Sequence, residues 1–280
     1  PQLEQLRDRA LAALATATGG AAVLANSAPH ARHEVTCLPA DLIARSGMAD
    51  GQHLSNGLVA AWVAIDATTV TPLDAAVIAA ADRSAPVGVT ETDDRSIVID
   101  NGVVAVTIDG DGLITSVWDH RAEREVILDG QRANVLELSP DTPIEYDAWD
   151  LDDYYANSVT EITDVDAIEI VDRGPLVAAV TVRRSFGRSQ VIQTIVVRAG
   201  SARIDVITDI DWYEDDHVLK VAFPVDVHAD TAACEVQYGH TMRPTHASTS
   251  WDAAKFEICA HRFVDVSEHG YGVALLNDCK

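Results

Sequence analysis

The chain has 280 residues, of which 48% are hydrophobic and 23% are charged, so it is long enough to bury a sizeable core and does not belong to the disordered class. Its 44 acidic residues against 20 basic ones give a net charge of -24, which would repel nucleic acids and anionic lipids and excludes them as partners. The sequence shows no apolar run as long as a membrane span and no leader peptide, so it predicts a cytoplasmic protein with no membrane partner.

The cysteines give the same indication about the compartment. Cys37, Cys234, Cys259 and Cys279 stand far apart, with no C-x-x-C spacing and no neighbouring pair of histidines. This spacing is typical neither of a disulfide framework nor of a zinc knuckle. Reduced thiols in an intracellular protein are the expectation, although the sequence leaves one disulfide bond open.

Residues 1–18 are predicted to form a helix that ends a helical bundle. Leu3, Leu6, Leu11 and Leu14 recur at helical spacing, and the glycine pair at 19–20 would end the helix. A lone amphipathic helix of this length has little stability in water, so it needs a surface to lie on. Since no loop precedes it, the start of the chain is interpreted as a cut through a longer helical region.

Residues 19–90 are predicted to form a small β-sandwich. The apolar stretches here are short and are separated by turn-forming residues. They are Ala22–Ala25, Val35–Leu38, Leu58–Ile65 and Ala75–Ala80. The last of them is equally compatible with a helical turn.

Residues 91–280 are predicted to form a large antiparallel β-supersandwich. Turns at Asn101-Gly102 and Gly110–Gly112 separate apolar runs into consecutive hairpins. Further strands are predicted at Ile168–Val171, Leu176–Val182, Val191–Val197, Ile204–Trp212, with one buried face, and Lys220–Val227. Tyr271–Leu276 is predicted to be a buried strand, after which the chain stops without a tail, so this domain is expected to be truncated at its C-terminus.

Two polar segments rich in aromatic residues are the candidates for binding. Residues 145–155 hold four aromatic side chains and five acids, which suits a sugar: rings stack on its C–H faces while carboxylates bind its hydroxyls. Residues 238–252 are predicted to be a long irregular run between strands, rich in hydrogen-bonding groups. The alternatives are a solvated acidic loop for the first segment and a covering loop for the second.

Catalytic and metal motifs are not recognisable. His240 and His246 have no third ligand near them in the sequence, and the acidic cluster at 209–217 lacks the spacing of a calcium loop, so it is interpreted as a strand end with an exposed turn. Carboxylates are plentiful, but no pair is singled out by its spacing as the acid and nucleophile of a glycosidase.

A set of short motifs resembles the β region that follows the catalytic domain in the family 38 α-mannosidases. They are Asp147-Ala148-Trp149-Asp150 with Tyr154-Tyr155, Leu219–Val225, Tyr238-Gly239-His240, Arg243-Pro244-Thr245-His246, Thr249-Ser250-Trp251-Asp252, Ala260-His261-Arg262 and Gly272–Lys280. The resemblance is densest from Leu219 onward. It implies that the large sandwich is similar to the galactose-mutarotase supersandwich.

The same resemblance implies what the parent enzyme does. That family hydrolyses α-mannosides with retention, using an aspartate nucleophile, a general acid and a zinc ion held by histidines and aspartates. The motif of its last zinc histidine is not present in this sequence, so no catalytic or metal residue is assigned here. Loops of the large β domain reach the substrate in this family, which makes the following residues candidates for substrate binding: Trp149, Asp150, Tyr155, Arg243, His246 and Asp252.

The chain is therefore predicted to be a non-catalytic region that frames the active site of an α-mannosidase and is inactive alone. Its expected partners are a mannose-containing oligosaccharide and the upstream catalytic domain of the same polypeptide, and a homo-oligomer is left open. The alternatives are a stand-alone carbohydrate-binding module and a mutarotase-like epimerase. The epimerase would need a histidine facing a carboxylate, for which His228 or His240 could serve.

Overall fold

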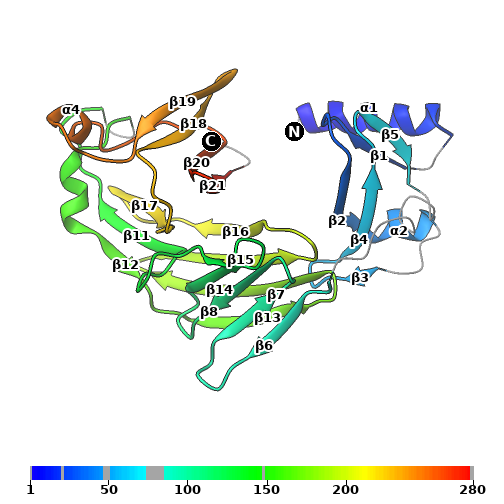
Figure 1. Cartoon of the computed structure of the whole chain (residues 1–280), viewed down its shortest axis with the longest axis horizontal. Helices are drawn as coiled ribbons and strands as arrows, with labels where there is room; N and C mark the ends of the chain where they lie inside the picture. Colours follow the sequence, from blue (N-terminus) through cyan, green and yellow to red (C-terminus); the bar gives the residue numbers. More distant parts are fainter. Residues whose placement is uncertain (1, 20–21, 47–50, 74–84, 147–148, 278–280) are drawn as a thin grey trace. The chain divides into compact units, whose positions relative to one another are not determined.

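The computed structural model describes residues 2–19, 22–46, 51–73, 85–146 and 149–277 (Figure 1). The predicted Ala75–Ala80 stretch, Asp147 and Cys279 lie outside the described residues. The chain is mainly antiparallel β, as the sequence predicted. It divides into two compact units, one of Pro1–Ala105, Val165–Ser185 and Ser189–Trp212, the other of Val106–Asp164, Phe186–Arg188 and Tyr213–Lys280. The domain boundaries expected at residues 18 and 90 stay a prediction.

Within the described residues the strands pair into six sheets. Their orders are β1-β5, β2-β4-β3, β13-β14-β15-β16, β12-β11-β17, β19-β18-β20-β21 and β10-β9-β8-β7-β6. The first unit holds α1 Gln2–Ala17, β1 Val23–Asn26, β2 Arg32–Pro39, α2 Ala40–Ser46, β3 Gln52–His53, β4 Leu58–Ile65, β5 Thr69–Pro72, β6 Gly88–Glu91, β7 Ile97–Asp100, β13 Ala167–Arg173, β14 Val177–Phe186, β15 Ser189–Arg198 and β16 Ile204–Asp211. The second unit holds β8 Val104–Ile108, β9 Ile114–Asp119, β10 Arg124–Glu125, β11 Val135–Pro140, the 3-10 helix η1 Asp153–Ser158, β12 Thr160–Ile162, β17 His217–Ala222, β18 Thr231–Val236, β19 Gly239–Pro244, α4 Ser250–Ala253, β20 Phe263–Glu268 and β21 Tyr271–Leu276.

The predicted N-terminal helix is confirmed as α1. It ends where Gly19 takes a φ of +73°, a left-handed conformation that suits glycine after a helix. Ala15 is buried, whereas Leu3 and Leu6 are 82% and 60% exposed. The apolar stripe of this helix is thus only partly covered within the chain.

One apolar core cluster of the first unit lies beside β4. Val59, Ala61 and Val63 are buried on one face of this strand and pack with Ile43 of α2 and Leu73. The sequence analysis did not predict α2. The sequence holds two short signals for the start of this helix: Pro39 precedes it, and Asp41 places an acid in its first turn.

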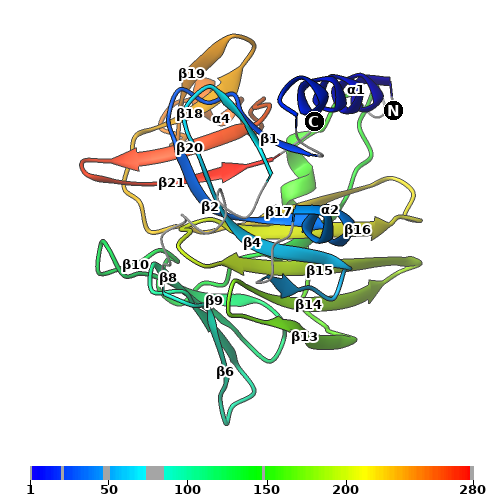
Figure 2. The same ribbon diagram turned by 90° about the vertical axis from the view of Figure 1, so that its right-hand side faces the viewer.

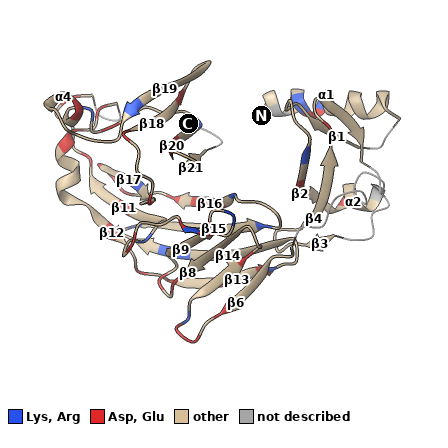
Figure 3. Cartoon of the chain, in the orientation of Figure 1, with Lys and Arg blue, Asp and Glu red and all other residues tan. Residues whose placement is uncertain are grey.

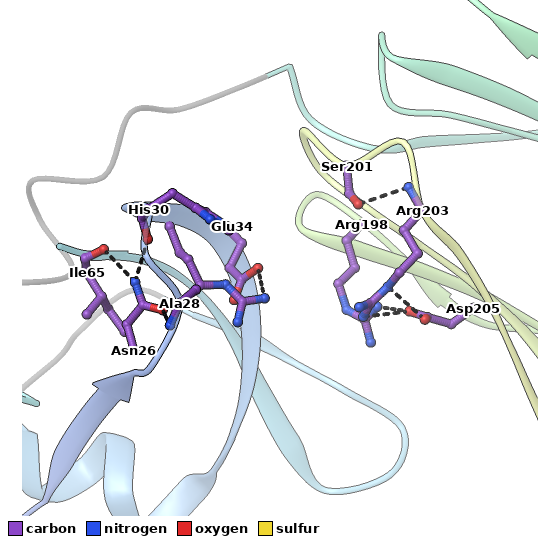
Figure 4. A network of polar contacts seen from close by, with 10 residues as sticks. Asn26, Ala28, His30, Glu34, Ile65, Arg198, Ser201, Arg203 and Asp205 are labelled. Atoms are coloured by element: carbon purple, nitrogen blue, oxygen red, sulfur yellow. Dashed lines mark hydrogen bonds and ion pairs between the residues drawn. The ribbon is translucent and has the colours of Figure 1, made fainter. Parts of the chain in front are cut away.

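Two networks of polar contacts lie in the first unit (Figure 4). The buried Asn26 donates to the carbonyl oxygens of His30 (2.8 Å) and Asp66 (3.0 Å), and so ties the end of β1 to neighbouring turns. Beside the turn from β15 to β16, Asp205 accepts from Arg198 and Arg203. Figure 2 shows β13, β14, β15 and β16 side by side in one sheet.

Some strand predictions are corrected by the structure. The predicted Lys220–Val227 strand runs instead from His217 to Ala222, because Pro224 has no N–H to continue the ladder. The predicted buried faces of the strands ending at Trp212 and Leu276 are wrong: Ile210 is 49% exposed and Leu276 is 59% exposed. Both β16 and β21 are edge strands of their sheets, where side chains have fewer neighbours.

The second binding segment is also more regular than predicted. Its first part is the strand β19, which pairs with β18 through a two-residue turn at Gln237 and Tyr238. Tyr238 adopts a φ of +65° in this turn. The alternation of apolar residues in the sequence does not predict such a conformation. The acidic cluster at 209–217, by contrast, is the predicted strand end and exposed turn. Figure 3 shows Asp and Glu on strands and turns of both units, in keeping with the net charge of -24.

Candidate functional site

The aromatic segment comprises residues 144–146 and 149–155 of the second unit and is largely presented to solvent. Trp149 is 92% exposed, Tyr146 is 69% exposed and Ile144 is 85% exposed. A turn shapes the tip: the Trp149 N–H donates to the Tyr146 carbonyl oxygen at 2.8 Å. The Asp150 carboxylate accepts from the Leu151 N–H and stays open to solvent. An exposed indole beside a free carboxylate oxygen is the pairing that a sugar ring requires.

Tyr155 closes this segment and is held from two directions. Its hydroxyl accepts from the Lys220 ammonium at 2.5 Å and donates to the Glu257 carboxylate at 2.6 Å. The ammonium also stands 4.3 Å from the centre of the Tyr155 ring, and the Phe256 ring lies 6.4 Å away. Burial raises the pKa of Tyr155, and the hydrogen bond to Glu257 adds to the rise.

Lys220 stays protonated in this cluster. Burial lowers the pKa of Lys220, but hydrogen bonds to Glu257 and Tyr155 outweigh that effect, and its pKa lies above the ordinary value. Lys220 stands on β17, whose six residues pair with β11. The ammonium is therefore a fixed positive charge on a sheet, shared by two segments that are distant in sequence.

His246 and Asp252 are brought together around α4. Thr249 is the N-cap of this helix and forms a capping box with Asp252, which accepts from the Thr249 N–H at 3.1 Å and from its hydroxyl at 2.8 Å. The hydrogen bond from the Thr249 hydroxyl is the main cause that lowers the pKa of Asp252, and the bond from the Thr249 N–H lowers this pKa less. The His246 ring lies 3.9 Å from the same carboxylate. Asp252 thus has a structural role for which the Thr-x-x-Asp spacing at 249–252 was the available sequence signal.

Arg243 is half-buried on β19. Its Nη2 atom donates to the Cys259 carbonyl oxygen at 3.2 Å, whereas its Nε atom is buried and has no partner among the described residues. A guanidinium in this state can still receive a hydroxyl or carboxylate oxygen from a ligand. The structure therefore leaves Arg243 chemically capable of the predicted contact.

An open cleft of about 390 Å³, the Tyr238 cleft, lies at the β18–β19 turn and is one that the sequence analysis missed. It is lined by Glu235, Gln237, Tyr238, His261 and Arg262. Glu235 organises its floor by accepting from the His261 and Arg262 backbone N–H groups. Tyr238 opens the second candidate segment and the motif around His261 carried part of the resemblance, but neither residue was named among the six substrate-binding candidates.

The described residues do not fit a metal centre. They contain no group of three or more His, Cys, Asp or Glu side chains that could hold a metal ion. Cys37 and Cys234 carry free thiols. No helix in the described ranges is long and apolar enough to cross a membrane.

Comparison with known proteins then decides the family. Residues 99–280 match the C-terminal domain of glycosyl hydrolases family 38. The chain belongs to glycosyl hydrolase family 38. This membership confirms the resemblance seen in the sequence motifs, and it does not favour a stand-alone carbohydrate-binding module or an epimerase built on His228 or His240.

Relatives within family 38 include three α-mannosidases. The chain is 38% identical to human alpha-mannosidase 2C1 over 197 residues, 39% identical to alpha-mannosidase G of Dictyostelium discoideum over 203 residues and 36% identical to the alpha-mannosidase of Saccharomyces cerevisiae over 202 residues. These matches cover 70%, 70% and 67% of this chain and 19% of each relative. The chain thus spans about a fifth of the length of the curated relatives it matches.

A solved structure supports the family fold. The crystal structure of an alpha-mannosidase from Enterococcus faecalis V583 superposes with a TM-score of 0.59 at 14% sequence identity. The match covers 91% of this chain and 37% of that one. At such low identity the match concerns the fold alone.

Proposed function

We propose that this chain is the β region of an α-mannosidase, and that the whole polypeptide hydrolyses α-mannosides with retention. In this proposal the β region frames the active site and contributes part of the surface that binds the oligosaccharide. The observation that carries it is the aromatic segment, where the Trp149 indole is 92% exposed next to an unburied acid. Such an indole has little structural use, since it packs against almost nothing, but it can stack on a sugar ring.

Two further features support a sugar as the ligand. The Arg243 guanidinium is half-buried and donates from its Nη2 atom, and the Tyr238 cleft combines an aromatic ring with an imidazole and a carboxylate. Neutral sugars also suit a surface with a net charge of -24, because they are not repelled as anions would be. Trp149, Asp150, Tyr155, Arg243, His246 and Asp252 are proposed as the substrate-binding residues, and Asp252 would act in addition to its capping role.

The catalytic carboxylates and the zinc ion of the parent enzyme are assigned to the rest of the polypeptide. Zinc, when bound there, would supply Lewis-acid stabilisation and orient the sugar hydroxyls. In this proposal the residues of this chain take part by positioning the substrate. We further propose a cytoplasmic location, in keeping with the free thiols of Cys37 and Cys234.

Substitutions in the full-length enzyme test the binding role. With Trp149→Ala and with Arg243→Ala we expect KM for a mannoside to rise about fivefold to tenfold, because losing about 1–1.4 kcal/mol of contact weakens binding by that factor. The matched control is Trp118→Ala, which removes a partly exposed tryptophan from β9 of the same unit. Unchanged kcat and KM in both test variants would exclude a substrate-binding role for these loops.

A second experiment tests whether the region is catalytic. The pure chain is assayed with a chromogenic α-mannoside in the presence of added zinc, next to the full-length enzyme. We expect no turnover by the pure chain. Clear turnover would contradict the assignment of the catalytic residues to the rest of the polypeptide.

A further inference from the structure

A four-residue cluster joins the aromatic segment, which the proposed function assigns to the sugar, to the segment that follows α4. The Lys220 cluster consists of Lys220, Tyr155, Glu257 and Phe256. Tyr155 ends the aromatic segment, and Glu257 lies in the post-α4 segment, residues 254–258. Both of their side chains bind the same ammonium, that of Lys220 on β17, and they also bind each other. Figure 1 shows β17, β11 and α4 at one end of the second unit.

The strength of this cluster comes from its combined geometry. A single exposed ion pair contributes little to stability, with a median of about 0–1 kcal/mol. Here the Lys220 side chain is only 30% exposed, and it combines an ion pair with a phenol hydrogen bond and a ring contact at 4.3 Å. The aromatic ring and the carboxylate are thus oriented by one charge on a paired strand.

The tip of the aromatic segment has few other contacts that could fix its position. Trp149 and Tyr146 are largely exposed, so apolar packing does not hold them. At the base, the Tyr154 hydroxyl binds the Thr142 carbonyl oxygen and interacts with Asp152, both within the same loop. In the post-α4 segment, Phe256 is 43% exposed and Ile258 is 44% exposed. Lys220, on the paired strand β17, contacts both segments, through Tyr155 and through Glu257.

We propose that Lys220 is a positioning residue, which holds the aromatic segment and the post-α4 segment at a fixed spacing and thereby sets the affinity of the enzyme for an extended mannoside. The effect on affinity rests on the proposed function, whereas the effect on spacing does not. Lys220 acts through Tyr155 and Glu257 and is not required to touch the sugar. Its substitution should therefore change KM more than kcat.

The experiment compares three variants by amide hydrogen exchange of the pure chain. Lys220→Met removes the charge but keeps most of the side-chain length, and Lys220→Arg restores a cation that can bind both Tyr155 and Glu257. Lys255→Met is the matched control, since it removes an equal charge from an exposed site within the post-α4 segment. We expect at least tenfold faster exchange at 149–158 and 254–258 in Lys220→Met, with unchanged exchange in β11 and β18.

The other two variants complete the test. Exchange within about twofold of the original chain in Lys220→Arg and Lys255→Met supports the proposal. Equal acceleration in β11 and β18, or fast exchange in Lys255→Met as well, would overturn it, because Lys220 would then contribute only general stability or charge.

Kinetics of the full-length enzyme separate this proposal from the proposed function. We expect Lys220→Met to raise KM for an extended mannoside at least fivefold, to change kcat less than twofold, and to be rescued by Lys220→Arg. Faster amide exchange in both segments of Lys220→Met together with an unchanged KM would support the positioning role and contradict the sugar-binding role of the loops. Unchanged amide exchange in these segments would overturn the positioning role whatever the kinetics.

Discussion

Replacing Asn101 with alanine should loosen the junction between two hairpins of the first unit. Asn101 is only 1% exposed and follows β7. Its Nδ2 atom donates to the carbonyl oxygens of Arg198 at 2.6 Å and Ser201 at 2.7 Å. Its Oδ1 atom accepts from the N–H groups of Val103 at 2.9 Å and Val104 at 2.8 Å. The side-chain amide of Asn101 thus binds backbone groups of its own turn and of the turn that follows β15.

The expected cost follows from these four hydrogen bonds. Each contributes about 0.5–1.5 kcal/mol net, and a buried carbonyl or N–H left without a partner costs about 1–3 kcal/mol. Water entering the vacated space would recover part of that cost. We therefore expect Asn101→Ala to lower the free energy of opening of this junction by about 3–4 kcal/mol.

Amide hydrogen exchange measures the effect where it occurs. A loss of about 3–4 kcal/mol corresponds to exchange roughly 100- to 1000-fold faster in residues 97–108 and 191–204. Asn56→Ala is the matched control, because Asn56 is exposed and its side chain accepts a single hydrogen bond, from the Leu58 N–H at 3.1 Å. If Asn101→Ala accelerated exchange no more than Asn56→Ala does, the assignment of Asn101 as a buried connector would be refuted.

Two further predictions concern the second unit. Ile108→Ala should cost about 2–5 kcal/mol in urea unfolding, because Ile108 is 0% exposed, whereas Leu128→Ala, at 42% exposure, should cost less than about 1 kcal/mol. The Arg124 guanidinium lowers the pKa of Glu268, so the contribution of Glu268 to stability is present above its unfolded pKa of about 4.3 and is lost as pH falls through its lower folded pKa. The unfolding midpoint of the original chain should therefore exceed that of Glu268→Gln at pH 7 and approach it at acidic pH; a constant difference between them would contradict this.

The strands could be predicted from the sequence where alternation and turn residues coincide. Gly102 and Gly112 take φ values of +74° and +73° at the two predicted turns, and β7, β8 and β9 follow as expected. Burial of a strand is less predictable, because it depends on what packs against the sheet. Ile210 alternates with acids in the sequence, yet it lies on an edge strand and is half exposed.

In the candidate site, too, single residues could be named from the sequence, whereas the contacts between distant segments could not be predicted. Trp149 and Arg243 were named as candidates through the family resemblance of their loops, and their role stays a prediction. Lys220 and Glu257 could not be joined by sequence reasoning, since 37 residues separate them and neither has a local pattern that indicates the other. Their contact exists only because β17 pairs with β11 and so brings Lys220 to the end of the aromatic segment. Clusters of this kind are a property of topology.

Asp252 takes part in capping α4 and is also proposed to bind the sugar, and these two roles can be tested separately. A carboxylate has about four lone-pair sites, and Thr249 occupies two of them through its N–H and hydroxyl. Both of these bonds end on Oδ2, so the proposed contact with a sugar hydroxyl is assigned to the other oxygen, Oδ1. Thr249→Val removes the hydroxyl but keeps the carboxylate, whereas Asp252→Asn removes the charge but keeps an oxygen acceptor for the cap.

The two substitutions should therefore separate capping from binding. In the pure chain, Thr249→Val should accelerate amide exchange at 250–254 more than Asp252→Asn does, because only the former removes the group that accepts from the Asp252 N–H. In the full-length enzyme, Asp252→Asn should raise KM for a mannoside about fivefold and Thr249→Val less than twofold, since only Asp252 is proposed to contact the sugar. Equal changes of KM in the two variants would show that Asp252 acts on the substrate only through the helix that it caps.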